Sequence, residues 1–438
     1  MKKSLLFLAF FAIFLGAAEP KLKIAVVSDI HEKWNELDRV FAFLAAKKPD
    51  AVLFGGDLTN GNPQSYKTYG EYFKKHFAGL KNAPVHIPIL GNHDYLGHPN
   101  RNDRLTAQGS MERFFKPMGL PAKWLQHHRI NGYTIIGVSA TDIKGEHRFT
   151  ESEIKQVSDL IGKAEKEAPG KPVFVLTHCP PAFTLLSSAF SPVPRPKARF
   201  HWRYDNVRKM LENHPQVVSL SGHTHLAIED ERTIWQGEFT AVHAGVLRWV
   251  TPIRPTPLSG LIETRDRFRG RNFIYIEVFE NKMIIYRFDA ETLREIKPQN
   301  RWEVALPYRP EKAVYTAKRG EKTVAPEFPA NAKAEIVRDG KLLYLKLDRA
   351  KHPDMVAAYK LKLTYDNNKH PEQELFVSSD FFIYGKEKDR MLNIDERVKI
   401  APGTGVMEIT PYEVFGKAGK TLTSRFAIPE LKNVAKGK

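Results

Sequence analysis

Five short clusters of Asp, Asn and His occur in order along this chain, and each directly follows an apolar, β-rich run. They are Asp29-Ile30-His31, Gly56-Asp57, Gly91-Asn92-His93-Asp94, Thr177-His178 and Gly222-His223-Thr224-His225. Carboxylate, amide and imidazole groups supply the oxygen and nitrogen ligands that divalent metals of hard to borderline character prefer. Two Asp, one Asn and four His are enough ligands for two metal ions that share one bridging carboxylate.

The elements that must position these clusters follow from the alternation of short apolar runs with helical patterns. The runs are Lys23–Ser28, Ala51–Phe54, Val85–Leu90, Pro172–Leu176 and Val217–Leu220, and the helical patterns are Trp34–Ala46, Gln64–Phe77, Ser110–Phe115, Glu151–Lys166 and Arg203–Glu212. Thr150 followed by Glu153 predicts a capping box. Alternating strands and helices predict an α/β core, in which the carboxyl ends of the strands gather the clusters at one sheet edge.

This ordered series resembles the calcineurin-like metallophosphoesterases, whose pattern is D-x-H, G-D, G-N-H-[DE], a single His and G-H-x-H. The resemblance runs from Lys21 to about Phe288. It implies two mixed β-sheets flanked by helices, a four-layer sandwich. It also implies two metal sites that share Asp57. The first site would comprise Asp29, His31, Asp57 and His225, and the second Asp57, Asn92, His178 and His223.

The resemblance further implies that His93 is a proton donor or charge stabiliser over the substrate, oriented by Asp94. An Asp rather than a Glu at position 94 is commoner in the cyclic-nucleotide phosphodiesterase-like branch. Purple acid phosphatases are similar in architecture but place a metal-bound Tyr three residues after the bridging Asp. Asn60 occupies that position here, which argues against a ferric-tyrosinate centre.

A phosphoesterase mechanism is consistent with these residue types. Two divalent ions about 3.5–4 Å apart can clamp the oxygens of a phosphoryl displacement, and a bridging hydroxide is the expected nucleophile. Such a site would hydrolyse a phosphodiester or a phosphomonoester. The ligand set accepts Mn, Fe, Zn or Co, and the sequence does not choose among them.

Each cluster also has a structural explanation when it is taken alone. Gly55-Gly56-Asp57 could be a simple turn, and His178 a hydrogen-bonded core histidine. Five such coincidences in order, each after a strand, favour the metal site. Two other functions stay open: a nuclease on extracellular nucleic acid, and an inactive binding or scaffold protein that retains the fold.

A Pro-stiffened basic loop, Ser187–His201, lies between the ligand candidates His178 and His223. We expect it to leave and return to the active-site edge. Arg199, His201 and Trp202 are therefore candidates for contact with the substrate phosphate or an organic group, although an exposed connector would have the same composition.

The length of the chain predicts two domains, and its N-terminal segment predicts export. The chain has 438 residues, of which 42% are hydrophobic. Lys2 and Lys3, an apolar run Leu5–Leu15 and small residues up to Ala18 are typical of a secretory signal, which predicts a periplasmic or secreted protein with no membrane span in the mature chain. The predicted units are a signal at 1–18, a catalytic domain at 19–297, a linker at 298–332 and a β-sandwich at 333–430.

Charge and cysteine content add little about partners. The net charge of +17 could steer an anionic phosphoester, but the Lys and Arg residues are spread over the whole chain, so nucleic acid is not the favoured partner. The single cysteine, Cys179, follows a ligand candidate and is expected to be a buried bystander. The oligomeric state is left open.

The C-terminal third alternates apolar and polar residues in short segments separated by turns such as Asp339-Gly340 and Pro402-Gly403. This pattern predicts a small antiparallel sandwich. The Tyr412–Lys417 stretch resembles the last hairpin of fibronectin type III-like modules. Because the segment carries no titratable cluster, we expect it to be dispensable for chemistry, so that a chain ending near Pro298 should keep most activity.

Overall fold

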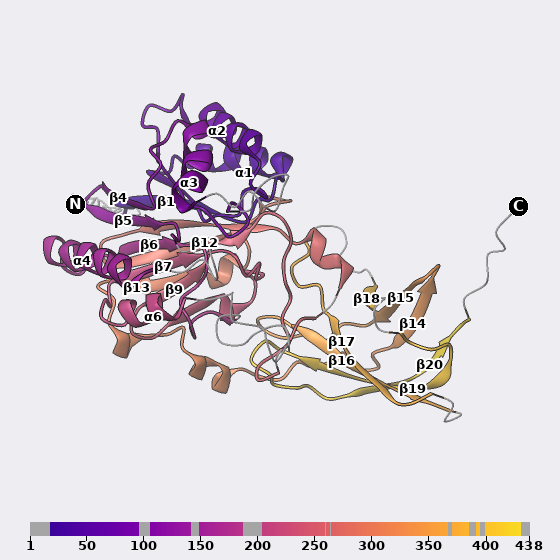
Figure 1. Cartoon of the computed structure of the whole chain (residues 1–438). Helices are drawn as coiled ribbons and strands as arrows, with labels where there is room; N and C mark the ends of the chain where they lie inside the picture. The colour runs from indigo at the N-terminus through magenta and orange to yellow at the C-terminus, as the bar shows by residue number, and fades with distance from the viewer. Residues whose placement is uncertain are drawn as a thin grey trace, which may run out of the picture.

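The computed structural model describes residues 18–95, 106–141, 149–186, 204–258, 260–262, 264–366, 370–384, 391–394 and 399–430. Two mixed β-sheets lie face to face in the first two thirds of the chain, and helices cover their outer faces (Figure 1). Two smaller antiparallel sheets follow in the C-terminal third. The predicted fold class is therefore confirmed in both parts.

The first sheet combines three parallel strands with antiparallel strands contributed later in the chain. In spatial order it contains β13 (Trp302–Ala305), β12 (Lys282–Asp289), β11 (Asn272–Val278), β1 (Leu22–Val27), β2 (Ala51–Phe54) and β3 (Val85–Pro88), with β10 (Gly245–Val246) paired to β11. β1, β2 and β3 are parallel neighbours, so their carboxyl ends open on one edge. The clusters at positions 29, 57 and 92–94 follow these three ends.

The second sheet supplies the other two clusters. Its order is β4 (Leu125–Ile130), β5 (Tyr133–Val138), β6 (Val173–Thr177), β7 (Val217–Ser221), β9 (Thr240–His243) and β8 (Ile234–Gln236). β5, β6, β7 and β9 run parallel, and His178 and His223 directly follow β6 and β7.

Helices form the outer layers because each has one buried apolar face. α1 (Trp34–Ala46), α2 (Pro63–Phe77) and α3 (Ala107–Phe115) pack on the first sheet, and α4 (Glu151–Glu167) and α6 (Asp205–Leu211) on the second. The predicted capping box at Thr150 is present. Between the sheets lies a continuous apolar layer in which strand residues such as Ile24, Leu53, Phe174 and Leu220 are fully buried.

The C-terminal sandwich packs two antiparallel sheets on one apolar core. One sheet contains β14 (Ala334–Asp339), β15 (Leu342–Leu347) and β18 (Leu392–Ile394). The other contains β17 (Gln373–Ser378), β16 (Ala358–Tyr365), β19 (Gly403–Tyr412) and β20 (Leu422–Ile428). Leu345 and Leu361, from opposite sheets, share this core. The more specific likeness to fibronectin type III modules stays a prediction.

The segment expected to be a linker, 298–332, contributes to the catalytic core. β13 lies in it and pairs with β12, and Trp302 is fully buried between the two large sheets. Tyr308 packs in the same layer. The prolines on either side led to the prediction of a linker. The four residues Trp302–Ala305 nevertheless alternate between buried and exposed, with the two-residue period of a strand.

A buried polar hub joins the linker segment to the catalytic domain and to the sandwich. Glu231 accepts hydrogen bonds from Arg287 Nη1 and Trp302 Nε1, each at 2.8 Å. Lys297 Nζ lies 3.3 Å from Glu231 Oε1 and also pairs with Asp354, which precedes β16. Glu231 and Arg287 are buried and Lys297 and Asp354 are partly buried, and their ion pairs help to fix how the two parts meet.

Candidate metal centre

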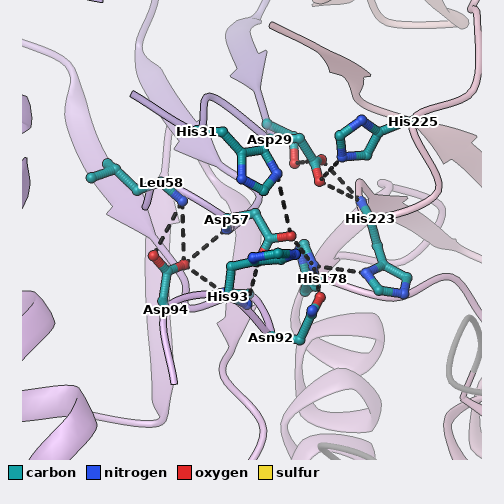
Figure 2. Close-up of polar contacts among 12 residues, drawn as sticks. Asp29, His31, Asp57, Leu58, Asn92, His93, Asp94, His178, His223 and His225 are labelled. Carbon is teal, nitrogen blue, oxygen red and sulfur yellow. Dashed lines mark hydrogen bonds and ion pairs between the residues drawn. The ribbon is translucent and has the colours of Figure 1, made fainter. Parts of the chain in front are cut away.

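The described structure brings the seven predicted ligand residues together at the shared edge of the two large sheets (Figure 2). Three overlapping groups have ligand atoms that all lie within 4.8 Å of one another. The groups are Asp29, His31 and His225; His31, Asp57 and His93; and Asp57, His178 and His223. Asp57 belongs to two of these groups, as a carboxylate shared by two neighbouring cations would.

The Asp29 side of the centre is built from two loops. His225 Nε2 lies 3.3 Å from Asp29 Oδ1, and the His223 backbone N–H donates to Asp29 Oδ2 at 2.9 Å. His225 Nδ1 is 3.0 Å from the carbonyl of Trp249. Because a carbonyl oxygen can only accept a hydrogen bond, Nδ1 of His225 carries the proton and donates it to this carbonyl. The unprotonated Nε2 is then free to act as a ligand.

On the Asp57 side, a backbone carbonyl likewise orients one histidine toward the neighbouring ligand candidates. His178 Nε2 lies 3.3 Å from Asp57 Oδ2, 2.9 Å from Asn92 Oδ1 and 3.0 Å from His223 Nδ1. His178 Nδ1 lies 2.7 Å from the carbonyl of Gly55, so its Nε2 faces the centre. Four potential ligand atoms thus converge on one point.

His31 tests whether these residues suit a metal. Its side chain is only 4% exposed, and both ring nitrogens are buried without a hydrogen-bond partner. The closest acid, Asp57, lies 3.6 Å away from Nε2. A buried polar atom without a partner costs free energy, and a cation placed between His31 and Asp57 would remove that cost. The donor set therefore fits a pair of divalent ions.

The backbone at these positions has an uncommon conformation. Five of the predicted ligands have positive φ angles, namely Asp29 (51°), His31 (42°), Asp57 (59°), His223 (66°) and His225 (53°). Non-glycine residues seldom adopt this region, and such strain clusters at functional sites. Gly91 and Gly222 allow the loops to approach, because a Cβ at either position would collide with the carboxylate of Asp57 or of Asp29.

Burial and close opposite charges shift the pKa values of the candidate ligands. Burial raises the pKa of the Asp57 carboxyl, but the nearby His178 outweighs it, so that this pKa lies well below its usual value. Burial lowers the pKa of His178, yet Asp57 and Asp29 raise it to about 9. Burial lowers the pKa of His31 and that of His223 to about 3, which favours neutral imidazoles that are ready to accept a cation.

The expected partnership of His93 with Asp94 needs correction. The ring of His93 pairs with Asn60, whose Oδ1 lies 2.6 Å from His93 Nδ1. The buried Asp94 carboxylate instead accepts backbone N–H bonds from Asp57 at 2.8 Å and Gly91 at 2.9 Å, and from Leu58 at 3.2 Å. Asp94 therefore ties the loops after β2 and β3 together, and Asn60 orients His93.

The remaining sequence predictions divide between the described and undescribed residues. Arg199, His201 and Trp202 lie outside the described residues. Cys179 is buried as expected, and burial raises the pKa of its thiol. Sequence reasoning did not identify Trp249, whose ring lies 5.1 Å from that of His225. The only sequence signal for it was a Trp beside an Arg shortly after β9.

Comparison with known proteins identifies one domain of the chain. The family model described as calcineurin-like phosphoesterase matches residues 22–227, a range that includes every one of the seven predicted ligands. Residues 22–227 therefore form a calcineurin-like phosphoesterase domain. No curated protein matches the chain. Within the described ranges, no helix has the length and apolar character needed to cross a membrane.

Three solved structures illustrate the proteins to which the chain is similar. A dimetal phosphatase from Danio rerio is 12% identical, with a TM-score of 0.41 over 66% of this chain and 99% of that one. A purple acid phosphatase from yellow lupin is 12% identical, with a TM-score of 0.42 over 65% and 53%. A 5'-nucleotidase precursor from Thermus thermophilus is 13% identical, with a TM-score of 0.32 over 67% and 55%. The assignment of the phosphoesterase domain rests on the family match over residues 22–227.

Proposed function

We propose that this protein is a binuclear-metal phosphoesterase that hydrolyses an anionic phosphodiester or phosphomonoester. The observation that carries the proposal is the overlap of the three ligand groups at Asp57 and His31. Asp57 Oδ2 lies between His31 Nε2 at 3.6 Å and His178 Nε2 at 3.3 Å, so its carboxylate can serve two cations.

The two sites would share only Asp57 and divide the other six ligands between them. Asp29, His31, Asp57 and His225 would hold one divalent ion, and Asp57, Asn92, His178 and His223 the other. Bound there, the ions would supply Lewis acidity toward the phosphoryl oxygens and activate water. The oxygen and nitrogen donors accept Mn, Fe, Zn or Co.

His93 is the residue that we assign to the leaving group. Its ring lies edge-on to His31, with centroids 4.8 Å apart, and its backbone N–H donates to Asp57 Oδ1 at 2.8 Å. With Nδ1 directed at the Asn60 amide oxygen, Nε2 remains to donate a proton to the departing oxygen. A histidine placed in this way is a general acid, whereas Asp94 acts through the loops.

Export is a separate part of the proposal. It rests on Lys2, Lys3 and the apolar run Leu5–Leu15, which lie outside the described residues. N-terminal sequencing of the protein recovered from the periplasm or medium tests it. A mature chain beginning near Glu19 supports export, and a protein that retains Met1 inside the cell contradicts it.

The activity is tested with metal-free protein reconstituted separately with Mn, Fe, Zn or Co and assayed on a panel of phosphate mono- and diesters. We expect metal-dependent hydrolysis that Asp57→Asn abolishes. The matched control is Glu71→Gln, which changes a well-exposed acid on α2 and should keep the wild-type rate. Failure of the loaded wild type on the whole panel would contradict the proposal. Cleavage of polynucleotides alone, with a steep salt dependence, would make nucleic acid the substrate.

A further inference from the structure

A strip of basic and aromatic side chains borders the centre beside His31 and His225. The ring of Trp249 lies nearly parallel to His31, at 11° with centroids 6.1 Å apart, and 5.1 Å from His225. Phe268 meets Trp249 edge to face at 5.7 Å. The Arg248 guanidinium lies over the Trp249 ring, 3.8 Å from its centroid. We call Arg248, Trp249 and Phe268 the aromatic wall.

The wall is fixed to the ligands and to the scaffold behind it. The carbonyl of Trp249 is the one that orients His225, and the next residue, Val250, donates its N–H to the carbonyl of Arg267 at 3.2 Å. Val250 packs in turn on the buried Phe382 of the C-terminal part. Because this hydrogen bond joins the segment that carries Trp249 to the segment that carries Phe268, and Val250 is packed from behind, the two rings are preorganised.

Two members of the aromatic wall, Phe268 and Arg248, have groups that remain available to a ligand. Phe268 is 48% exposed although it lies beside a polar, charged centre. Arg248 is half-buried, and within the described part of the chain no hydrogen bond or ion pair engages its guanidinium. Its position beside the centre follows from two contacts: the guanidinium lies over Trp249, which stacks on His31, and the N–H of the preceding Leu247 donates to the carbonyl of Ser28 at 3.2 Å. A guanidinium without a hydrogen-bonded acid, close to a half-exposed aromatic ring, is suited to an anion that carries an organic ring.

We propose that the aromatic wall binds the organic group of the substrate and selects phosphoesters in which that group is a planar ring, as in a nucleoside or a phenyl ester. This inference rests on the proposed phosphoesterase function. The exposed part of the Phe268 ring contacts the planar group, Trp249 backs Phe268 and Arg248, and Arg248 holds an anionic oxygen of the phosphate. An aliphatic group would gain less, because the wall consists of quadrupolar rings and a cation rather than branched alkyl side chains.

The test compares two non-hydrolysable phosphonates that have the same charge and differ in the ring. Binding of phenylphosphonate and of methylphosphonate to the Mn²⁺-loaded full chain is measured by calorimetry, with metal content determined for each variant. Wild type should bind phenylphosphonate about 5-fold more tightly or better. Phe268→Ala should bring the ratio of the two affinities close to one. Arg248→Gln should weaken both ligands and preserve the ratio.

The control is Val324→Ala, which truncates an exposed apolar side chain in the segment before the sandwich and should leave both affinities as in wild type. Equal binding of the two phosphonates by wild type, or an undiminished preference in Phe268→Ala, would overturn the aromatic wall while leaving the phosphoesterase proposal intact. Binding of neither phosphonate would overturn both, since the centre itself would then not recognise a phosphoryl group.

Discussion

His93 Nδ1 lies 2.6 Å from Asn60 Oδ1, so a neutral amide, and not a carboxylate, orients the proposed general acid. Asn60 belongs to the loop after β2 and His93 to the loop after β3, and the Asp94 carboxylate joins these loops by accepting N–H bonds from both. The position of the acid therefore depends on one side-chain contact and on one buried carboxylate that supports it.

This relationship predicts different consequences for the two residues. His93→Ala should lower turnover by about 10²–10⁴-fold with metal content kept, because the acid is lost while the proposed ligands remain. The loss should be smaller for nitrophenyl esters, whose leaving group needs little protonation. Steady-state kinetics on alkyl and nitrophenyl esters, with metal analysis, measure both effects. Loss of metal from this variant would make His93 a ligand instead.

Asn60→Ala should produce a smaller change of the same kind. Removing the acceptor frees the His93 ring to rotate, so we expect kcat on alkyl esters to fall about 10-fold with little change for nitrophenyl esters. Asn60→Asp retains an acceptor at the same position and should recover most of the rate. An Asn60→Ala variant that matches wild type on both esters would show that the contact does not position His93.

The stability of the protein should respond to pH through the buried Glu229, whose Oε2 accepts a hydrogen bond from Asn272 Nδ2 at 3.3 Å. Burial, followed by the charge of Asp289, raises the pKa of Glu229 from 4.5 to about 7, against the opposing effects of Tyr384 and Arg287. Between these values the folded protein holds a proton that the unfolded chain releases. The contribution of this group is therefore fully present below pH 4.5 and is lost as the pH rises toward 7.

Glu229→Gln should remove that loss of stability. Its free energy of unfolding relative to wild type should rise between pH 4.5 and 7, by about 3 kcal/mol at most, at about 1.4 kcal/mol per pKa unit. Denaturant unfolding at several pH values measures the difference, with the exposed Glu71→Gln as control. A difference that does not vary with pH would mean that Glu229 is ionised in the folded protein.

A chain ending near Pro298 should fail to fold, contrary to what the sequence pattern indicates. The truncation removes β13 and with it Trp302, which is fully buried and donates to Glu231. Loss of such a side chain costs about 3–5 kcal/mol before the exposed strand edge of β12 is counted. Solubility and thermal unfolding of the truncated protein test this. A soluble chain that melts like the full-length protein would show that β13 is not part of the core.

The sequence predicts the centre well where a ligand directly follows a strand. Asp29, Asp57, His178 and His223 fall at the ends of apolar runs. Parallel pairing brings those ends to one edge of the sheet independently of the loop conformations. The partner of His93 was not predictable, because it depends on loops with positive φ angles that the pattern of residue types does not encode. Trp249 was missed because β10 is only two residues long and gives no periodic signal.

Asp57 is the residue that we propose is shared by two cations, and metal stoichiometry tests this role most directly. Metal-free protein is titrated with each candidate divalent metal, and the bound equivalents are counted for wild type, His225→Ala and Asp57→Asn. We predict two equivalents for wild type, selective loss of one site in His225→Ala, and loss or scrambling of both sites in Asp57→Asn. Two tightly bound equivalents in Asp57→Asn, with activity close to wild type, would contradict the shared site.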